Sequence, residues 1–184
     1  MPYIIGCDVD DVCCDLLGPW IRWYNQKFSD TLRKSDLTKW DWTDLIKPEC
    51  GRQLFDYLSL PNYYQEDVTP IEGAREGIKL LRSQGYRVIF ITASVGTGGE
   101  QKLRWLTEQG FLDGAGPEDY VSTTDKSPYA KLCDVMIDDR PSNLTPFKQG
   151  ILFSQPWNRA EDGPNKVRSW EEIPSLIAAL TLNP

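Results

Sequence analysis

The chain has 184 residues, of which 40% are hydrophobic, and it carries a formal net charge of −7 with no histidine. This length predicts one well-buried domain with room for a small subdomain, and the acidic balance argues against a broad nucleic-acid-binding surface. No apolar run approaches the ~20 residues that span a bilayer, and the lack of histidine excludes mechanisms that need an imidazole.

The five cysteines are scattered and include no C-x-x-C pair, which argues against a structural zinc site. The segment Met1-Pro2-Tyr3 enters a predicted strand at once and leaves no room for a signal peptide. Free thiols without a targeting segment are typical of a reducing compartment. We therefore expect a cytoplasmic protein with no membrane partner and no nucleic-acid partner, and leave open whether it forms a homodimer.

An apolar run over residues 3–7 stops at Asp8 and Asp10. A strand that ends in Asp-x-Asp places two like-facing carboxylates at the edge of a sheet, because side chains alternate along a strand. The two negative charges repel each other, so a cation is expected between them. A calcium loop is the common alternative, but that loop requires glycine at its sixth position, where this chain has Cys13.

Residues 15–69 differ from the rest of the chain because they are rich in aromatic side chains and contain no long β-branched run. Residues 15–28 have the spacing of an amphipathic helix interrupted by Gly18-Pro19, and residues 50–58 predict another helix. The sequence therefore predicts a helical insertion. Its aromatic side chains include Trp20, Trp23, Trp40, Trp42, Tyr63 and Tyr64.

From residue 70 onward, predicted strands and helices alternate along the chain. The predicted strands cover residues 87–91, 120–122, 135–137 and 151–153. The predicted helices cover residues 73–83, residues 99–109, a segment that begins near Pro141, and residues 170–180. This alternation predicts a parallel sheet with helices on both faces, and residues 156–164 are expected to form a polar surface loop.

Polar side chains follow these strands: Thr92 after residues 87–91, Lys126 after residues 120–122, and Asp138 and Asp139 after residues 135–137. Because the carboxyl ends of parallel strands meet at one edge of a sheet, the acidic pairs predict a hard-cation site there. Each residue also has a plainer interpretation. Thr92 could cap the following helix, Asp139 could pair with Arg140, and Lys126 could be an exposed lysine with Lys131 as the rival phosphate binder.

Four segments in this order resemble the motifs of the haloacid-dehalogenase (HAD) phosphohydrolase superfamily: Asp8-Val9-Asp10-Asp11-Val12, Ile91-Thr92-Ala93-Ser94, Lys126 and Ile137-Asp138-Asp139. The resemblance implies an α/β fold, a HAD-like Rossmannoid three-layer sandwich with a parallel sheet and a small helical cap inserted after the first strand. Residues 1–14 and 70–184 would form the catalytic core, and residues 15–69 would form the cap.

The same resemblance implies a Mg²⁺-dependent phosphomonoesterase. Asp8 would attack phosphorus to form an aspartyl-phosphate, and Asp10 would serve as general acid and base. Asp8, the backbone carbonyl of Asp10 and Asp138 would hold Mg²⁺, with Asp139 acting through water. The phosphoryl oxygens would be bound by Thr92, the Ala93 amide, Ser94 and Lys126.

The insertion, together with Asp15 and the segment Ile137-Asp138-Asp139-Arg140-Pro141, looks most like the 5′(3′)-deoxyribonucleotidase family. Asp11 departs from that pattern, because the animal enzymes have glycine there. Leu16 replaces a base-contacting phenylalanine, and Ala93 replaces a phosphate-binding serine. The resemblance implies a small-molecule substrate, a (deoxy)nucleoside monophosphate, with base and sugar preference and the 5′ or 3′ position left open.

Trp40 and Trp42 are the leading candidates for stacking on a nucleobase, because Lys39, Asp41 and Thr43 make that stretch a predicted loop. The alternatives are a phosphatase of another small phosphate ester, a catalytically silent metal-binding or interaction domain, and a polynucleotide-end phosphatase. The acidic balance and the cap disfavour the last. A response-regulator receiver would need a phosphoacceptor aspartate between Asp10 and Thr92 at a strand end, and none is predicted there.

Overall fold

The computed structural model describes residues 2–94, 98–162 and 165–182. Within these residues, six parallel strands form one sheet in the order β5-β4-β1-β6-β7-β8, with β1 near the centre between β4 and β6. The parallel sheet predicted from the sequence is therefore confirmed. Its strands are β1 (Ile4–Cys7), β4 (Arg87–Thr92), β5 (Tyr120–Ser122), β6 (Val135–Asp138), β7 (Gly150–Phe153) and β8 (Lys166–Val167).

The side chains of β1 alternate between two apolar layers, as the period of two along a strand requires. Ile5 and Cys7 belong to the larger buried cluster, whereas Ile4 packs against the smaller cluster on the other face. Gly6 also points to that second face, where an added Cβ would lie 2.8 Å from the Met136 sulfur. Glycine at this position therefore allows close packing directly before the carboxylates.

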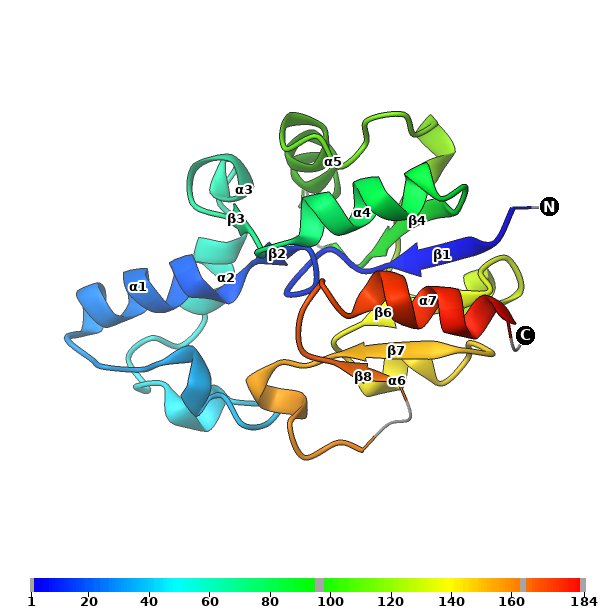
Figure 1. The fold of residues 1–184 in the computed structure, drawn as a ribbon. Coiled ribbons are helices and arrows are strands. Elements are labelled where there is room, and N and C mark those ends of the chain that lie inside the picture. Colours follow the sequence, from blue (N-terminus) through cyan, green and yellow to red (C-terminus); the bar gives the residue numbers. More distant parts are fainter. Residues whose placement is uncertain (1, 95–97, 163–164, 183–184) are drawn as a thin grey trace.

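Helices cover both faces of the sheet (Figure 1). On the larger cluster lie α4 (Ala74–Ser83), α5 (Gly98–Glu108) and α7 (Ile173–Leu182), and on the smaller one lie α6 (Pro141–Leu144) and the 3-10 turn η4 (Ser127–Lys131). Gly85 and Gly110 follow α4 and α5 with φ of 89° and 75°, the left-handed conformation that commonly ends a helix. The predicted three-layer arrangement is confirmed.

Residues 15–69 leave the sheet and return to it through a short antiparallel pair, β2 (Cys14–Asp15) with β3 (Thr69–Pro70). Between these strands lie three helices, α1 (Leu17–Phe28), α2 (Gln53–Leu58) and α3 (Tyr63–Glu66), and two 3-10 turns, η1 (Lys34–Asp36) and η2 (Thr43–Leu45). They lie beyond the carboxyl ends of the strands, on the side opposite the two chain termini (Figure 1).

Two sequence-based expectations for this segment need correction. Gly18-Pro19 does not interrupt the first helix but lies in its first turn, where the missing proline N–H leaves no intrahelical bond unmade. The second helix begins at Gln53 rather than at residue 50. Many of the aromatic side chains form the segment's own core, with Trp20 stacked on Tyr24 at 5.2 Å between ring centroids.

Two features near the C-terminus were not predicted. Strand β8 is only two residues long, too short to produce a recognisable pattern. The predicted polar loop over residues 156–164 starts with a 3-10 turn, η5 (Pro156–Asn158), whose Trp157 and Asn158 are buried. Gly163 and Pro164 lie outside the described residues. Among the helices of the described chain, none is long and apolar enough to cross a membrane.

Candidate active site

The nucleophile candidate Asp8 is the first residue after β1. Its backbone N–H donates to the Ile137 carbonyl at 2.9 Å, which continues the pairing of β1 with β6 by one residue. The Asp8 Oδ1 atom accepts from the Val9 amide at 2.8 Å, so the carboxylate is turned back over the loop that follows the strand. The side chain is buried, as expected for a group at the base of a cavity.

Asp138 ends the neighbouring strand β6 and is fully buried. Its Oδ1 atom accepts from the Arg140 amide at 2.9 Å, and the Asn143 side-chain amide donates to the same carboxylate at 3.1 Å. Burial, followed by repulsion from Asp8, raises the pKa of Asp138 to about 6, although Lys126 opposes this shift. The adjacent strands thus bring two predicted site carboxylates together.

Lys126 lies between these two carboxylates. Its ammonium is 3.0 Å from Asp8 Oδ1 and 2.6 Å from Asp138 Oδ2, and the side chain is buried. Burial by itself would lower the pKa of Lys126, but the two carboxylates outweigh it and raise that pKa. The rival lysine, Lys131, is exposed at the end of η4. Of the two lysines left open by the sequence, only Lys126 lies at the carboxylates.

Asp139 completes a group of three buried carboxylates. Three carboxylate oxygens, one from each of Asp8, Asp138 and Asp139, lie within 4.8 Å of one another. The Trp157 indole N–H donates to Asp139 Oδ2 at 2.8 Å, yet burial and the charges of Asp138 and Asp8 raise the pKa of Asp139. One ammonium cannot balance three carboxylates, so this all-oxygen donor set fits a hard divalent cation.

Asp10 lies two residues after Asp8, and its carboxylate is not part of that group of three. Its strongest donors are Tyr64 and Lys102, and the Cys14 thiol adds a weaker contact to Oδ1 at 3.8 Å. The Tyr64 hydroxyl donates to Oδ1 at 2.5 Å, and the Lys102 ammonium donates to Oδ2 at 2.6 Å. The Asp10 side chain nevertheless retains about a quarter of its exposure, so it can still reach a bound molecule. Neither Tyr64 nor Lys102 was predicted to contact Asp10.

The residues predicted to bind phosphate lie at the end of β4. Thr92 is buried, and its Oγ1 accepts from Lys102 at 3.0 Å. Ala93 is exposed and borders the same cavity as Asp8 and Asp10. Ser94 instead borders a smaller adjoining cavity, which it shares with Asp10 and Lys102. The structure thus places Thr92 behind the cavity wall and Ala93 on its surface.

The cavity above these groups has a volume of about 430 Å³. Asp8, Asp10, Lys126 and Asp139 contribute its polar floor, and residues of the inserted segment form much of its wall. The large aromatic side chains that line it are Trp40, Trp42, Phe55 and Trp157. Charged and apolar side chains therefore line one cavity, whose volume is in the range of small-molecule sites.

Trp40 and Trp42 differ in how firmly they are held. Trp40 is half exposed, and the Arg140 guanidinium lies 4.5 Å from its ring centroid. Trp42 is half-buried and packs against Trp20, with ring centroids 5.0 Å apart. Both line the cavity, as the prediction requires, but Trp40 offers the more accessible ring.

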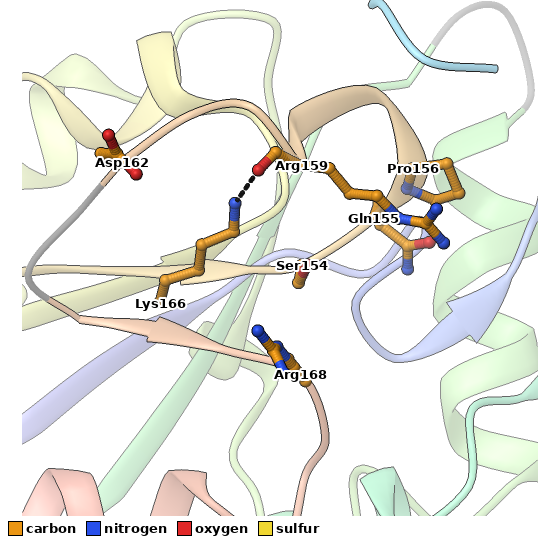
Figure 2. Close-up of a pocket in the computed structure, with 7 residues that line it drawn as sticks. All are labelled: Ser154, Gln155, Pro156, Arg159, Asp162, Lys166 and Arg168. Atoms are coloured by element: carbon orange, nitrogen blue, oxygen red, sulfur yellow. Dashed lines mark hydrogen bonds between the residues drawn. The ribbon is translucent and has the colours of Figure 1, made fainter. Parts of the chain in front are cut away.

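A larger hollow of about 700 Å³ lies elsewhere, at the carboxyl ends of β7 and β8 (Figure 2). It is lined by exposed charged side chains, including Arg159 and Arg168, and it contains none of the strand-end carboxylates. Its Lys166 ammonium is occupied by backbone carbonyls, among them that of Arg159 at 3.0 Å. The larger of these two cavities is therefore not the one that contains the strand-end carboxylates.

Sequence reasoning missed Lys102, although a signal existed. Lys102 precedes Trp105 and Leu106 by three and four positions, so it lies on the buried stripe of α5. A lysine within an apolar stripe requires a buried partner. Trp157 gave no such signal, because it lies in a stretch of polar and proline residues that predicts a surface loop.

Comparison with known proteins finds relatives that match nearly the whole chain. A family model described as "5' nucleotidase, deoxy (Pyrimidine), cytosolic type C protein" matches residues 2–182. A 5′(3′)-deoxyribonucleotidase from Clostridium acetobutylicum is 29% identical over 178 residues, which cover 96% of this chain and 95% of that protein. A 5′(3′)-deoxyribonucleotidase from Bacillus subtilis is 32% identical over 177 residues, which cover 94% of this chain and 97% of that protein.

Solved structures show the same fold at lower identity. A HAD family hydrolase from Deinococcus radiodurans, with bound phosphate and sodium, has a TM-score of 0.66 and 17% identity over 98% of this chain and 97% of that one. A haloacid dehalogenase-like protein from Agrobacterium tumefaciens has a TM-score of 0.70 and 13% identity over 98% of this chain and 100% of that one. These likenesses confirm the HAD-like α/β fold expected from the four motifs.

Proposed function

The chain belongs to the family of cytosolic type C deoxy 5′-nucleotidases, and from this premise we propose that it is a Mg²⁺-dependent 5′(3′)-deoxyribonucleotidase. Its substrates are (deoxy)nucleoside monophosphates, and its products are the nucleoside and inorganic phosphate. The named activity of relatives that match nearly the whole chain supports this assignment. The proposal includes an aspartyl-phosphate on Asp8 as the intermediate.

One observation carries the proposal. Asp8, Asp10 and Lys126 lie at the polar floor of the same cavity whose wall contains Trp40 and Trp42. A nucleoside monophosphate has one dianionic end and one flat aromatic end, and this cavity offers a complementary surface to each. A generic phosphatase would need only the polar floor.

In the first step, an Asp8 carboxylate oxygen attacks phosphorus while the bond from phosphorus to the ester oxygen breaks. The departing oxygen takes the proton carried by the Asp10 carboxyl group, so the nucleoside leaves as a neutral alcohol. In the second step, water attacks the phosphorus of the aspartyl-phosphate and gives a proton to Asp10. Asp8 is released as a carboxylate with inorganic phosphate, and Asp10 is ready for the next cycle.

The proposed metal ligands are Asp8, Asp138 and the backbone carbonyl of Asp10, with Asp139 acting through water. When bound, Mg²⁺ would offset the repulsion between the substrate dianion and these carboxylates. The three-carboxylate group supports this role, since its charge exceeds what Lys126 balances. A solved HAD hydrolase of the same fold, described with bound phosphate and sodium, is consistent with cation use in such a site.

We further propose that the phosphoryl oxygens are bound by Lys126, the Ala93 amide, Thr92 and Ser94. Lys126 is the best placed of these, because its ammonium already contacts Asp8. Thr92 is fully buried and its Oγ1 accepts a hydrogen bond from Lys102, so it is the least accessible of the four to a phosphoryl oxygen.

Residues 15–69 are proposed as the cap over a core of residues 1–14 and 70–184. The two-stranded pair of β2 and β3 at the junction supports these boundaries, since it marks where the insertion leaves and rejoins the core. A cap beside the nucleophile favours small substrates over the end of a polynucleotide. All five cysteines are buried thiols, which agrees with the proposed cytoplasmic location.

A phosphate-release screen tests the assignment. The panel contains deoxynucleoside and ribonucleoside monophosphates with 5′ or 3′ phosphates, together with sugar phosphates and p-nitrophenyl phosphate. We expect the highest kcat/KM for deoxynucleoside monophosphates. Equal kcat/KM for sugar phosphates would leave only a generic phosphatase, and no release from any ester would favour a catalytically silent domain.

A further inference from the structure

Both oxygens of the Asp10 carboxylate are held by donors from distant parts of the chain. Tyr64, from α3 of the inserted segment, donates to Oδ1 at 2.5 Å, and Lys102, from α5 of the core, donates to Oδ2 at 2.6 Å. We propose that Tyr64 and Lys102 are positioning residues that fix the orientation of Asp10 toward the leaving group. This inference rests on the proposed function, in which Asp10 is the general acid and base.

Lys102 is fixed by its own surroundings. Its side chain is only 4% exposed, and its ammonium has three acceptors: Asp10, Thr92 Oγ1 and the Ala93 carbonyl. An ammonium has three N–H donors, so each one is used. Because a buried lysine is costly unless it is fully paired, Lys102 cannot move without losing these contacts. It therefore offers Asp10 a rigid point of attachment.

Tyr64 is equally confined. Its side chain is buried, its ring packs edge-on against Tyr63 at 6.0 Å, and the Lys102 ammonium lies 5.8 Å from its ring centroid. Burial, followed by the nearby Asp10 charge, raises the pKa of Tyr64, so its hydroxyl keeps its proton and remains a donor. The neighbouring Gln65 donates to the Gln101 carbonyl at 2.9 Å, which ties α3 to α5.

The two donors leave Asp10 usable for proton transfer. A carboxylate has about four lone-pair positions. Tyr64 and Lys102 take one on each oxygen, and the weaker Cys14 thiol donor, at 3.8 Å, takes a second on Oδ1, which leaves one position on Oδ2. Asp10 still borders both the main cavity and its smaller neighbour. The side chain is therefore held in one rotamer while a free lone pair remains available to the substrate, which is the arrangement that catalysis by a positioned acid requires.

Tyr64 also links the inserted segment to Asp10, the proposed general acid and base. It lies just before β3, where the insertion returns to the core, so the placement of that segment sets one of the two bonds on Asp10. Specificity and proton transfer would then depend on the same segment. The consequence is measurable, because a misoriented Asp10 matters only when the leaving oxygen needs a proton.

The leaving group provides the readout. Cleavage of a nucleoside monophosphate expels a poor alkoxide, which needs the Asp10 proton, whereas p-nitrophenyl phosphate expels a stable phenolate that needs little protonation. A purely structural role for Tyr64 would change both burst rates alike. A positioning role should change the burst rate for the nucleotide much more than the burst rate for the aryl ester.

The experiment compares Tyr64→Phe with Tyr63→Phe by rapid-quench measurement of the burst on both substrates, at saturating Mg²⁺. Tyr63 is a matched control, because it is the adjacent buried tyrosine and its hydroxyl donates to the Leu16 carbonyl rather than to Asp10. For Tyr64→Phe we expect a fall of about tenfold to hundredfold on the nucleotide and less than about threefold on the aryl ester. Tyr63→Phe should change the two substrates equally.

Lys102→Gln provides a second test, read in the same way and accompanied by the thermal midpoint. It should also lose more activity on the nucleotide than on the aryl ester. Equal losses on both substrates for Tyr64→Phe and Lys102→Gln, or no loss for either variant, would overturn the inference. A wild type that releases no phosphate would instead refute the proposed function, so the two failures are distinguishable.

Discussion

The Lys34 ammonium lies 2.6 Å from a carboxylate oxygen of Asp11, a residue with a φ of 53° in the loop after β1. The same ammonium contacts Asp15 at 2.6 Å and lies 5.6 Å from the Trp157 ring centroid. A left-handed backbone favours glycine, and a buried carboxylate needs a partner. Lys34, from the inserted segment, supplies the positive charge that balances the buried Asp11 carboxylate.

Replacing Lys34 with methionine should therefore destabilise the protein. Asp11 is buried, and removing the partner of a buried charge costs up to about 3–5 kcal/mol. Urea denaturation at pH 7 measures the loss. The control is Lys39→Met, which breaks an exposed pair with Asp44 and should leave the free energy of unfolding nearly unchanged. Equal effects of the two substitutions would contradict a stabilising role for the Asp11–Lys34 contact.

The stability contributed by Asp11 should depend on pH. Burial, partly opposed by Lys34, raises the pKa of Asp11 to about 6 from 3.8. The folded state therefore binds this proton more tightly than the unfolded state, and stability falls as pH rises from about 4 to about 6. Relative to Asp11→Asn, the wild type should lose about 2 kcal/mol between pH 4.5 and pH 7. Denaturation of both metal-free proteins checks this, and a constant difference would be inconsistent with the raised pKa.

Activity should require a divalent cation. EDTA should abolish turnover, and Mg²⁺ should restore it. Binding alone is also measurable, because Mg²⁺ at about 100 times its Kd should add about 2.7 kcal/mol to the free energy of unfolding. Asp138→Asn should shift both responses to higher Mg²⁺ concentration. Asp134→Asn, an exposed carboxylate just before β6, should shift neither. Hydrolysis that persists in EDTA would rule out the proposed metal site.

Trp40 should contribute to nucleotide binding. Loss of a stacked aromatic typically costs ~1–3 kcal/mol, so Trp40→Ala should raise KM for a nucleoside monophosphate by about tenfold to hundredfold. The KM for p-nitrophenyl phosphate should hardly change. Trp23→Ala is the control, because Trp23 stacks on Tyr57 at 4.4 Å and does not line the cavity. An unchanged KM for the nucleotide in Trp40→Ala would show that Trp40 does not stack on the nucleobase.

The sequence predicted the sheet and the carboxylates because both are local signals. Asp8 and Asp138 each end an apolar strand, and parallel strands bring their carboxyl ends to one edge without further information. Choosing Lys126 over Lys131 was harder, since both lie in a polar stretch after β5. Only the packing of η4 under the sheet shows which lysine reaches Asp8 and Asp138.

The remaining contacts depend on tertiary packing. Tyr64 and Asp10 are 54 positions apart, and Lys102 is 92 positions from Asp10, so no local spacing relates them. Trp157 lies in a stretch whose composition predicts a surface loop, yet it is buried against Asp139. Composition describes the average environment of such a stretch and does not identify the single side chain that turns inward.

The most direct test of the account is the rate of phosphate release from a deoxynucleoside monophosphate by wild type and by Asp8→Asn, at saturating Mg²⁺. The asparagine keeps the shape of the side chain and removes the attacking charge. Turnover should fall by at least about 10³-fold, or about 4 kcal/mol in the barrier. The wild type should also be inhibited by beryllofluoride, a mimic of an aspartyl-phosphate. Turnover within about tenfold of wild type in Asp8→Asn would contradict covalent catalysis by Asp8.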